Sequence, residues 1–268
     1  MDKRIATFGD VLRDWRKRRR LTQMELAFRA NVSARHLGFV EVGRAAPGRA
    51  LVMRLSVELD LPLRERNAWL ILAGFAPVYT DYPYEHPQFD VVREAIEMTL
   101  NAHRPFPAFA LDRGYNVVAS NAALPELFDG VSPSLLTPPI NTMRLSLHPR
   151  GLAPRITNFP EWSEHLVEQI RRDLDVSGDR RLVALLEEID GYGLPKPRRK
   201  AGRAPAPSVV LPVRIRTALG ELAFFSTMTV FGTPTDVTLA EVAIEALFPA
   251  DAATRAIVLH AAGALPAR

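Results

Sequence analysis

The sequence contains no cysteine, which excludes disulfide bonds, thiolate zinc sites and thiol catalysis and is typical of a reducing cytosol. It also lacks an apolar run of membrane-spanning length, and its N-terminus, MDKRIATFGD, lacks the apolar core of a signal peptide. We therefore expect a cytoplasmic protein without membrane contact. Hydrophobic residues make up 47% of the 268 residues, an ordinary value for a globular protein, and the length suffices for two domains.

Motifs for enzymatic chemistry are missing as well. The sequence has no HExxH, GxSxG, P-loop or GxGxxG pattern. No two of its six histidines stand at metal-ligand spacing, and Ser146 and Ser226 have no evident base. We expect no catalytic residue, no metal and no cofactor. A further alternative is an enzyme that is regulated by its own N-terminal domain. Convergent polar groups in a cavity would favour this alternative.

Residues 21–47 carry the signals of two short helices joined by a tight turn. Thr22 and Glu25 form a capping box before the first helix. Ser33 caps the second helix, which ends at Gly43. Two helices that meet at a steep angle across such a turn form a helix-turn-helix. An all-helical interaction module is the alternative interpretation of this stretch.

The second of these helices has a buried stripe and an outward face. Leu37 and Val40 share the buried stripe, which leaves a polar N-terminus on the outside. The outward residues are Ala34, Arg35, Gly38 and Phe39, with His36 near the edge. Because arginine bonds guanine bidentately and a small alanine leaves room for a thymine methyl group, this face suits the major groove of DNA.

The motifs LTQ-x-EL-A, VS and E-x-G-R followed by a proline resemble the repressor-like helix-turn-helix of the XRE class, over about the first 75 residues. The resemblance implies that Gln23 contacts a phosphate, and that Arg16 and Glu41 form a structural salt bridge. It assigns contacts with bases or with the DNA backbone to Ser33, Ala34, Arg35 and Phe39. Many members carry a polar reader where this chain has Phe39, which either touches a thymine methyl group or does not reach DNA.

Positive charge is concentrated in the same part of the chain. Residues 1–75 hold 15 Lys and Arg against 8 Asp and Glu, a net charge of +7, whereas the remainder carries −3. This asymmetry is the electrostatic footprint of a DNA-binding module joined to another domain. The expected partner is double-stranded operator DNA, bound by a two-fold homodimer. The residues expected to contact it are Lys17, Thr22, Gln23, Ser33, Ala34, Arg35, His36, Phe39, Arg44 and Arg49.

The fold class predicted from the whole chain is multidomain. An all-α, five-helix repressor-like domain over 1–75 precedes a linker and connecting helix over 76–104 and an α+β, PAS-like domain with a five-stranded antiparallel sheet over 105–262. The helices predicted for the first domain cover residues 8–19, 23–30, 34–42, 50–59 and 63–74. The connecting helix is predicted over 88–103.

The C-terminal part combines short strands with helices. Two hairpins are predicted, over 108–120 around Asp112-Arg113-Gly114 and over 209–231. Residues 238–248 fit a helix and a strand equally well, and we choose a strand because it would cover the second hairpin. Further helices are predicted over 121–128, 138–147, 161–175, 179–189 and 251–260. The basic segment 192–207 is predicted to be a surface loop, with DNA contact as an alternative.

Three segments resemble the C-terminal ligand-binding domain of MmyB-like transcription regulators, over about residues 100–255: DRGYNVVASNAAL, PPINTMRLSLHPRGLAPRITNFPEW and RIRTALGELAFFSTMTVFGTPTDVTLAEVAIEALFPAD. The resemblance implies a PAS-like pocket with a fatty acid as the known type of ligand. The candidate ligand-binding residues are Phe128, Met143, Arg144, His148, Trp162, Phe224, Phe225 and Met228. A protein-interaction or dimerisation domain without a ligand is the runner-up.

Two of these candidates, Arg144 and His148, are expected to hold a carboxylate head group, since arginine forms charge-assisted pairs with it. A capping or salt-bridge role is the alternative for both. For the aromatic residues and methionines the alternative is a plain apolar core, because cores and pockets share the same lining.

Overall fold

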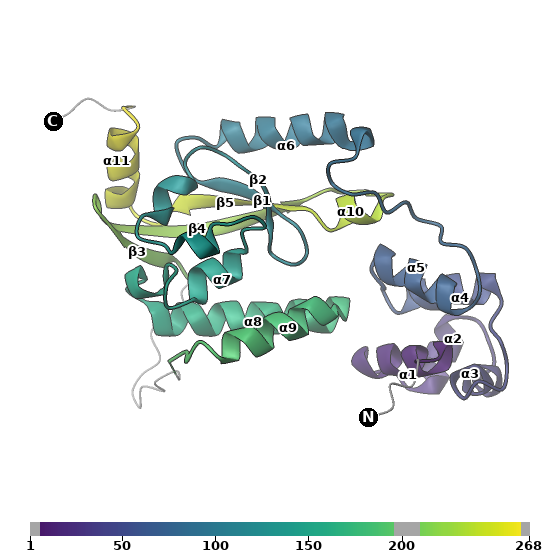
Figure 1. Ribbon diagram of the computed structural model, residues 1–268. Helices are drawn as coiled ribbons and strands as arrows, with labels where there is room; N and C mark the ends of the chain where they lie inside the picture. The colour runs from purple at the N-terminus through teal and green to yellow at the C-terminus, as the bar shows by residue number, and fades with distance from the viewer. Residues whose placement is uncertain (1–5, 196–209, 264–268) are drawn as a thin grey trace. The chain divides into compact units, whose positions relative to one another are not determined.

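The computed structural model describes residues 6–195 and 210–263, which divide into two compact units (Figure 1). The first unit comprises the chain up to Tyr82 with Pro234–Val237, and the second comprises 83–233 and the residues from Thr238 onward. Most of the basic segment predicted as a surface loop, and the beginning of the second predicted hairpin, lie outside the described residues. No helix among the described residues is long and apolar enough to cross a bilayer.

The first unit contains the five predicted helices. They are α1 (Phe8–Arg18), α2 (Gln23–Arg29), α3 (Ala34–Glu41), α4 (Arg49–Glu58) and α5 (Leu63–Leu72). Thr7 and Thr22 each complete a capping box, so the helices begin where side chains accept their first free N–H groups. Trp69, fully buried, meets the ring of Phe8 edge-on with the ring centroids 5.2 Å apart. This apolar core holds α2 and α3 as a helix-turn-helix.

The segment after α5, which the sequence suggested as a linker, is fastened to the first unit. The side chain of Asn67 accepts hydrogen bonds from the N–H groups of Val78 at 3.0 Å and of Tyr79 at 3.1 Å, and donates to the carbonyl of Tyr79 at 2.7 Å. One buried amide thereby satisfies three backbone groups. The first unit consequently extends beyond the predicted boundary at residue 75.

The second unit is built on a five-stranded antiparallel sheet in the order β2-β1-β5-β4-β3. The strands are β1 (Ala108–Leu111), β2 (Val117–Ser120), β3 (Val213–Thr217), β4 (Gly220–Val230) and β5 (Ala243–Pro249). The predicted strand at 238–248 is partly wrong, because a short helix, α10 (Val237–Ala240), precedes β5. As expected, β5 pairs with the hairpin, through β4.

Helices cover both faces of this sheet (Figure 1). On one face lies α6 (Asp90–Ala102), whose Ile96 and Leu100 pack with Ala108 and Ala110 of β1. Its assignment to a connecting segment was wrong, because its apolar stripe packs on the sheet. The other face is covered by α7 (Thr142–Leu147), α8 (Phe159–Ser177) and α9 (Arg180–Asp190). The last helix, α11 (Ala252–Ala261), packs against the same apolar cluster. Short 3-10 turns occur at Pro87–Phe89, Pro125–Phe128, Pro133–Leu135 and Ala153–Arg155.

Two predicted helices of this unit are shorter than expected. The stretch 121–128 forms only the 3-10 turn Pro125–Phe128. The Asn121 side chain accepts from Ala123 N at 3.2 Å, as a cap does, but it also accepts from Ala108 N at 3.2 Å and donates to Leu100 O at 2.9 Å. The helix predicted over 138–147 begins only at Thr142, where Asn141 accepts from Arg144 N at 3.1 Å.

Candidate functional site

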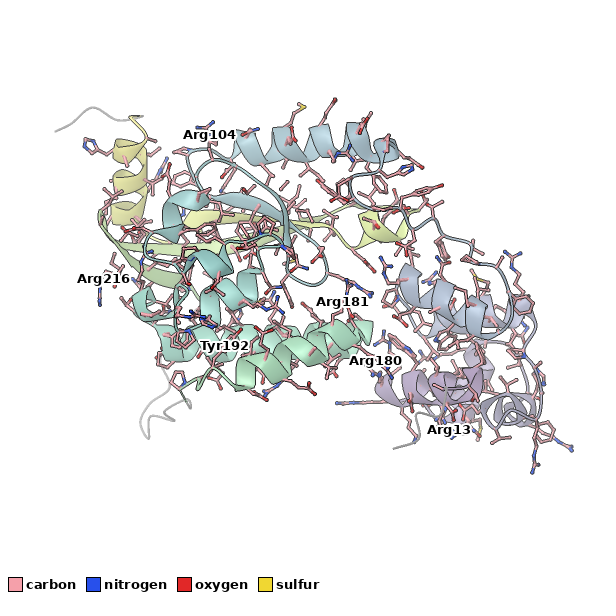
Figure 2. The ribbon with its side chains drawn as sticks, in the orientation of Figure 1. Arg13, Arg104, Arg180, Arg181, Tyr192 and Arg216 are labelled. Carbon is pink, nitrogen blue, oxygen red and sulfur yellow. The ribbon has the colours of Figure 1, made fainter. Side chains whose placement is uncertain are left out.

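Glu41, at the end of α3, joins α1, α2 and α3 of the first unit. Its carboxylate accepts from Arg16 Nε of α1 at 2.6 Å, from Arg16 Nη2 at 3.0 Å, and from Gln23 Nε2 of α2 at 2.7 Å. Arg13 (Figure 2) donates to the Glu41 carbonyl at 2.8 Å. The expected structural salt bridge between Arg16 and Glu41 is thereby confirmed.

This network lowers the pKa of the Glu41 carboxyl group. Burial alone would raise the pKa of its carboxyl group, but the hydrogen bonds from Arg16 and Gln23 and the charges of Arg16 and Arg13 outweigh burial and hold the pKa below its usual range. Gly9 lets α1 approach so closely, since a Cβ there would lie 2.5 Å from the Glu41 carbonyl oxygen. The contribution of Gly9 was not recognised in the sequence.

The outward face of α3 carries the side chains that were expected to contact DNA. Ser33, which caps the helix by accepting from His36 N at 3.1 Å, is exposed, as are Ala34 and Arg35. His36 and Phe39 are partly exposed. The guanidinium of Arg35 lies over the Phe39 ring, 5.4 Å from its centroid. Phe39 can thus orient Arg35 by a cation–π contact, a role that the sequence did not suggest.

The other residues expected to contact DNA precede and follow α3 in the sequence. Lys17 at the end of α1 and Arg44 and Arg49 after α3 are exposed. Thr22 is also exposed, and its hydroxyl is occupied by the capping box with Glu25. Gln23 is partly exposed, and its bond to Glu41 uses one of its two amide hydrogens. Contact of these residues with DNA remains a prediction.

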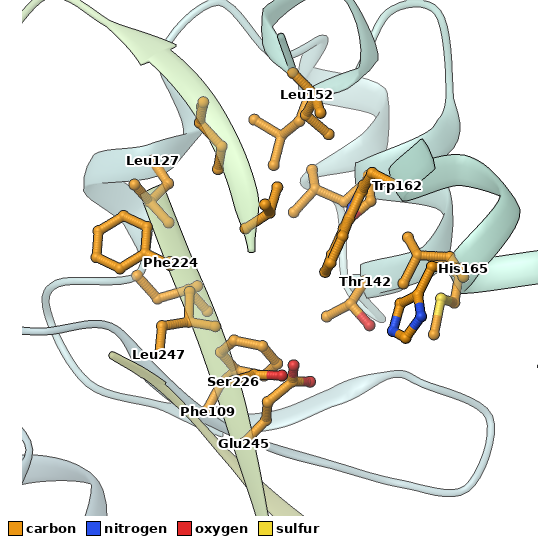
Figure 3. A pocket seen from close by; sticks show the side chains of 18 of the residues that line it. Phe109, Leu127, Thr142, Leu152, Trp162, His165, Phe224, Ser226, Glu245 and Leu247 are labelled. Carbon is orange, nitrogen blue, oxygen red and sulfur yellow. The ribbon is translucent and has the colours of Figure 1, made fainter. Parts of the chain in front are cut away.

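A cavity of about 100 Å³ lies in the second unit between the sheet and the helices of one face (Figure 3). Four residues predicted to bind a ligand line it: Phe128, Met143, Trp162 and Phe224. The sheet adds Phe109, Val213, Ile215 and Leu247, and the helical side adds Leu124, Leu127, Leu145, Leu152, Ile156 and Leu166. An engineered apolar cavity of about 150 Å³ accommodates benzene. This cavity therefore admits a compact apolar group, and a longer chain requires lining side chains to move.

Polar groups are few among the lining residues. They are Thr142, Ser146, His165, Gln169, Ser226 and Glu245, together with the indole Nε1 of Trp162, which is buried without a hydrogen-bond partner among the described residues. Burial and the charge of Arg172 lower the pKa of His165, so its ring is neutral at neutral pH. Burial raises the pKa of Glu245, although a hydrogen bond from Ser226 opposes the shift. No lysine or arginine of the described chain lines the cavity.

The two residues predicted to hold a carboxylate head group, Arg144 and His148, lie outside this cavity. The Arg144 guanidinium pairs with Glu188 of α9, with Nη2 2.8 Å from Oε2 and Nε 2.9 Å from both carboxylate oxygens. His148 packs edge-on against Tyr192 (Figure 2), with ring centroids 4.8 Å apart, and its Nδ1 accepts from Arg150 N at 2.9 Å. Arg144 thus has the salt-bridge role weighed as the alternative, and His148 stands at the C-cap of α7 with its ring packed on Tyr192.

Phe225 and Met228 also lie outside the cavity. Phe225 follows Phe224 on β4 and points to the opposite face of the sheet, where its ring stacks on Phe248 at a centroid distance of 5.7 Å. Met228 lies nearer the end of β4 and is 53% exposed. The alternation of side chains along the strand excludes Phe225. Met228 is in register with Glu245 on the cavity face but is not among the residues that line the cavity.

Sequence reasoning missed the lining residues Phe109 and Glu245, which stand opposite each other on β1 and β5. A signal for Glu245 was present, since it is the one acidic residue between the apolar Ile244 and Leu247 in a stretch with strand periodicity. The predicted strand left Glu245 outside the predicted core, on the face opposite to its apolar residues Val242, Ile244, Ala246 and Phe248.

The fold and the two sites define a DNA-binding regulator with a separate ligand-binding domain. The described geometry is matched by family comparisons: residues 12–66 match a helix-turn-helix family, and residues 92–259 match the MmyB-like transcription regulator ligand binding domain. Because the second match covers more than half of the chain, the chain belongs to the MmyB-like transcription regulators. Both families are regulatory.

Other comparisons add little. No curated protein matches this chain. A solved structure described as "Structure of an RNA-binding Light-Oxygen-Voltage Receptor" matches over 97% of this chain at 14% sequence identity, with a TM-score of 0.30. The match spans 65% of the length of that structure's chain. At this TM-score the likeness carries no inference about fold or function.

Proposed function

We propose that this regulator reads double-stranded operator DNA with the outward face of α3 and senses a small lipophilic ligand in the cavity of its second unit. Ligand binding would alter operator affinity by favouring one of two arrangements of the protein, which requires different ligand affinities in the two. The observation that carries the proposal is the apolar cavity between the sheet and α7 and α8, in a chain that also carries a complete helix-turn-helix.

The DNA-binding part of the proposal rests on the charges around α3. Arg35 is exposed at the N-terminal end of the helix, where the dipole and free N–H groups also favour phosphate. Lys17, Arg44 and Arg49 would contact phosphates on either side. We propose a two-fold dimer, since such readers bind paired half-sites, and a cytoplasmic location, where operator DNA is accessible.

The ligand part rests on the lining of the cavity. Its apolar walls suit an acyl chain, and a fatty acid is the ligand type that the family resemblance implies. The strand order and the helices between β2 and β3 support a PAS-like classification of the domain. A protein-interaction domain without a ligand is the alternative. The cavity favours the ligand, because close-packed protein interiors have few voids larger than a water molecule.

Native mass spectrometry of the purified full-length protein, followed by denaturation and analysis of the released molecules, tests the ligand directly. We expect a bound lipophilic molecule, and we expect its removal to change affinity for an operator selected from random DNA. Leu127→Trp fills the cavity and should abolish both effects, whereas Val183→Trp adds the same ring on the surface of α9 and should abolish neither. A protein that neither carries nor takes up a lipophilic molecule would support the protein-interaction alternative.

A further inference from the structure

Glu245 occupies a position where the pattern of the sheet calls for an apolar residue. It lies on β5, between β1 and β4, in register with Phe109 of β1. Residues in register on paired strands face the same side of a sheet, and so do residues two apart along a strand. Phe109, Glu245 and Leu247 accordingly all line the cavity. The neighbouring Ile244 belongs to the apolar cluster on the α6 face.

No lysine or arginine among the described residues lines the cavity beside this carboxyl group, although the charge of Arg172 reaches His165 on the opposite wall. Ser226 of β4 donates a hydrogen bond to it. Thr142 of α7 and His165 and Gln169 of α8 are other polar lining residues, and His165 is neutral at neutral pH. In Figure 3 the carboxyl group of Glu245 and the hydroxyls of Ser226 and Thr142 point into the cavity on the side away from Leu152. A carboxylate so placed needs another hydrogen-bond donor.

The ligand can supply that donor. We propose that the ligand of this cavity is a lipophilic molecule whose polar group donates a hydrogen bond to Glu245, as a hydroxyl or an ammonium group does. This inference rests on the proposed function and narrows it. A ligand carboxylate would place a second negative charge beside Glu245 with no lysine or arginine among the described lining residues to balance it. A fatty acid would therefore enter this site only in its protonated form.

Three probes with the same chain and different polar groups test the inference: hexan-1-ol, hexylamine and hexanoate. Isothermal titration calorimetry with the full-length protein at about pH 8 keeps the hexanoate ionised, since carboxyl pKa values lie near 4. We expect the alcohol and the amine to bind at least tenfold more tightly than hexanoate, a ratio that corresponds to about 1.4 kcal/mol. This ranking in the unaltered protein does not depend on any variant folding.

The substitution Glu245→Gln removes the charge and keeps the shape of the side chain. It should strengthen hexanoate binding and weaken hexylamine binding, each by about tenfold or more, because the sign of the local interaction changes. Glu94→Gln, on the exposed face of α6, removes the same charge away from the cavity and should change neither affinity.

The outcomes separate the two proposals. If hexanoate binds as tightly as hexan-1-ol and Glu245→Gln alters no ratio, Glu245 serves only the fold and the inference fails, while the proposed lipophilic site stands. If none of the three probes binds, nor their longer homologues, the proposed lipophilic site itself fails and the inference fails with it.

Discussion

Two glutamates, one in each unit, have pKa values that shift in opposite directions. Glu41 in the first unit receives hydrogen bonds from Arg16 and Gln23, and its pKa is lowered. Glu245 in the second unit receives one from Ser226, and its pKa is raised. The difference lies in the partners, since desolvation opposes the charged form in both places.

This contrast separates an acid that holds a fold together from one that is available to a ligand. The interactions of Glu41 are internal, and they fix α3 against α1 and α2 so that the outward face of α3 has a defined position. The carboxyl group of Glu245 has a hydrogen bond from Ser226 and no lysine or arginine beside it among the described residues that line the cavity. Unbalanced polar groups at the wall of an apolar cavity are a common basis of ligand specificity.

The largest expected difference between the two acids is in stability. Glu41→Gln leaves the guanidinium of Arg16, whose side chain is 12% exposed, without its charged partner and should lower the free energy of unfolding by roughly 3–5 kcal/mol. Glu245→Gln removes an unbalanced charge and should be neutral or stabilising. Urea denaturation in a Trp162→Phe background measures the first effect, because Trp15 and Trp69 then report on the first unit; circular dichroism measures the second. Equal losses would contradict the comparison.

The dependence of these differences on pH should have opposite signs. The folded-state pKa of Glu41 is below the unfolded value, so its contribution to stability is present above about pH 4.3 and is lost as the pH falls through the folded-state pKa. The folded-state pKa of Glu245 is above the unfolded value, so the stability of the wild-type protein relative to Glu245→Gln should fall as the pH rises above about 4.3. Denaturation of each variant and the wild type over a pH series measures both slopes, and slopes of the same sign would be inconsistent with the assigned shifts.

A second pair of variants tests the alternation along β4. Phe224 is 1% exposed and lines the cavity, so Phe224→Ala should lower the free energy of unfolding by about 3–5 kcal/mol and change ligand affinity. Phe225 is only partly buried on the other face. The loss in free energy of unfolding for Phe225→Ala should therefore be about 1–2 kcal/mol smaller than that for Phe224→Ala, and ligand affinity should stay unchanged. Thermal denaturation and calorimetry with the bound ligand check both. An effect of Phe225→Ala on ligand affinity as large as that of Phe224→Ala would refute the assignment of faces.

In the first unit, Arg35 should determine base specificity. Arg35→Ala is expected to lower operator affinity by roughly 1–3 kcal/mol and to relax the preference at one base pair. Competition binding with operators altered at single positions measures this effect. A uniform loss for all sequences would make Arg35 a phosphate contact.

The smallest effect is expected for Lys17, at the exposed end of α1. Lys17→Ala should weaken binding equally for all sequences and flatten the dependence of log affinity on log salt concentration by about one unit. Fluorescence anisotropy at several salt concentrations measures the slope. Glu58→Gln, on α4, is the control: it changes the net charge by one unit in the positive direction, whereas Lys17→Ala lowers it by one. An unchanged slope in Lys17→Ala would exclude a phosphate contact by Lys17.

Much of the first unit could be predicted because its signals are local. Capping boxes at Thr22 and a cap at Ser33 set the beginnings of α2 and α3 within a few residues of sequence. The pairing of Arg16 with Glu41 came from resemblance to a family. The close approach of Gly9 to Glu41 could not be predicted, since it depends on how α1 and α3 pack.

The cavity was harder to predict because residues distant in the chain form it. Phe128, Met143, Trp162 and Phe224 were identified as candidates by residue type, which also selected Arg144 and Phe225 incorrectly as cavity-lining residues. Whether a side chain faces the cavity depends on strand register and on competing partners such as Glu188, and neither is encoded in the neighbouring residues.

The sequence by itself determined the helix-turn-helix, the number of strands and the family, because caps, turn residues and motifs act over a few positions. Only the tertiary structure decided that Glu245 faces an apolar cavity and that Arg144 does not. The physical reason is that pairing between β5 and its neighbours selects the face on which each side chain lies, and burial then determines whether a charge has a partner.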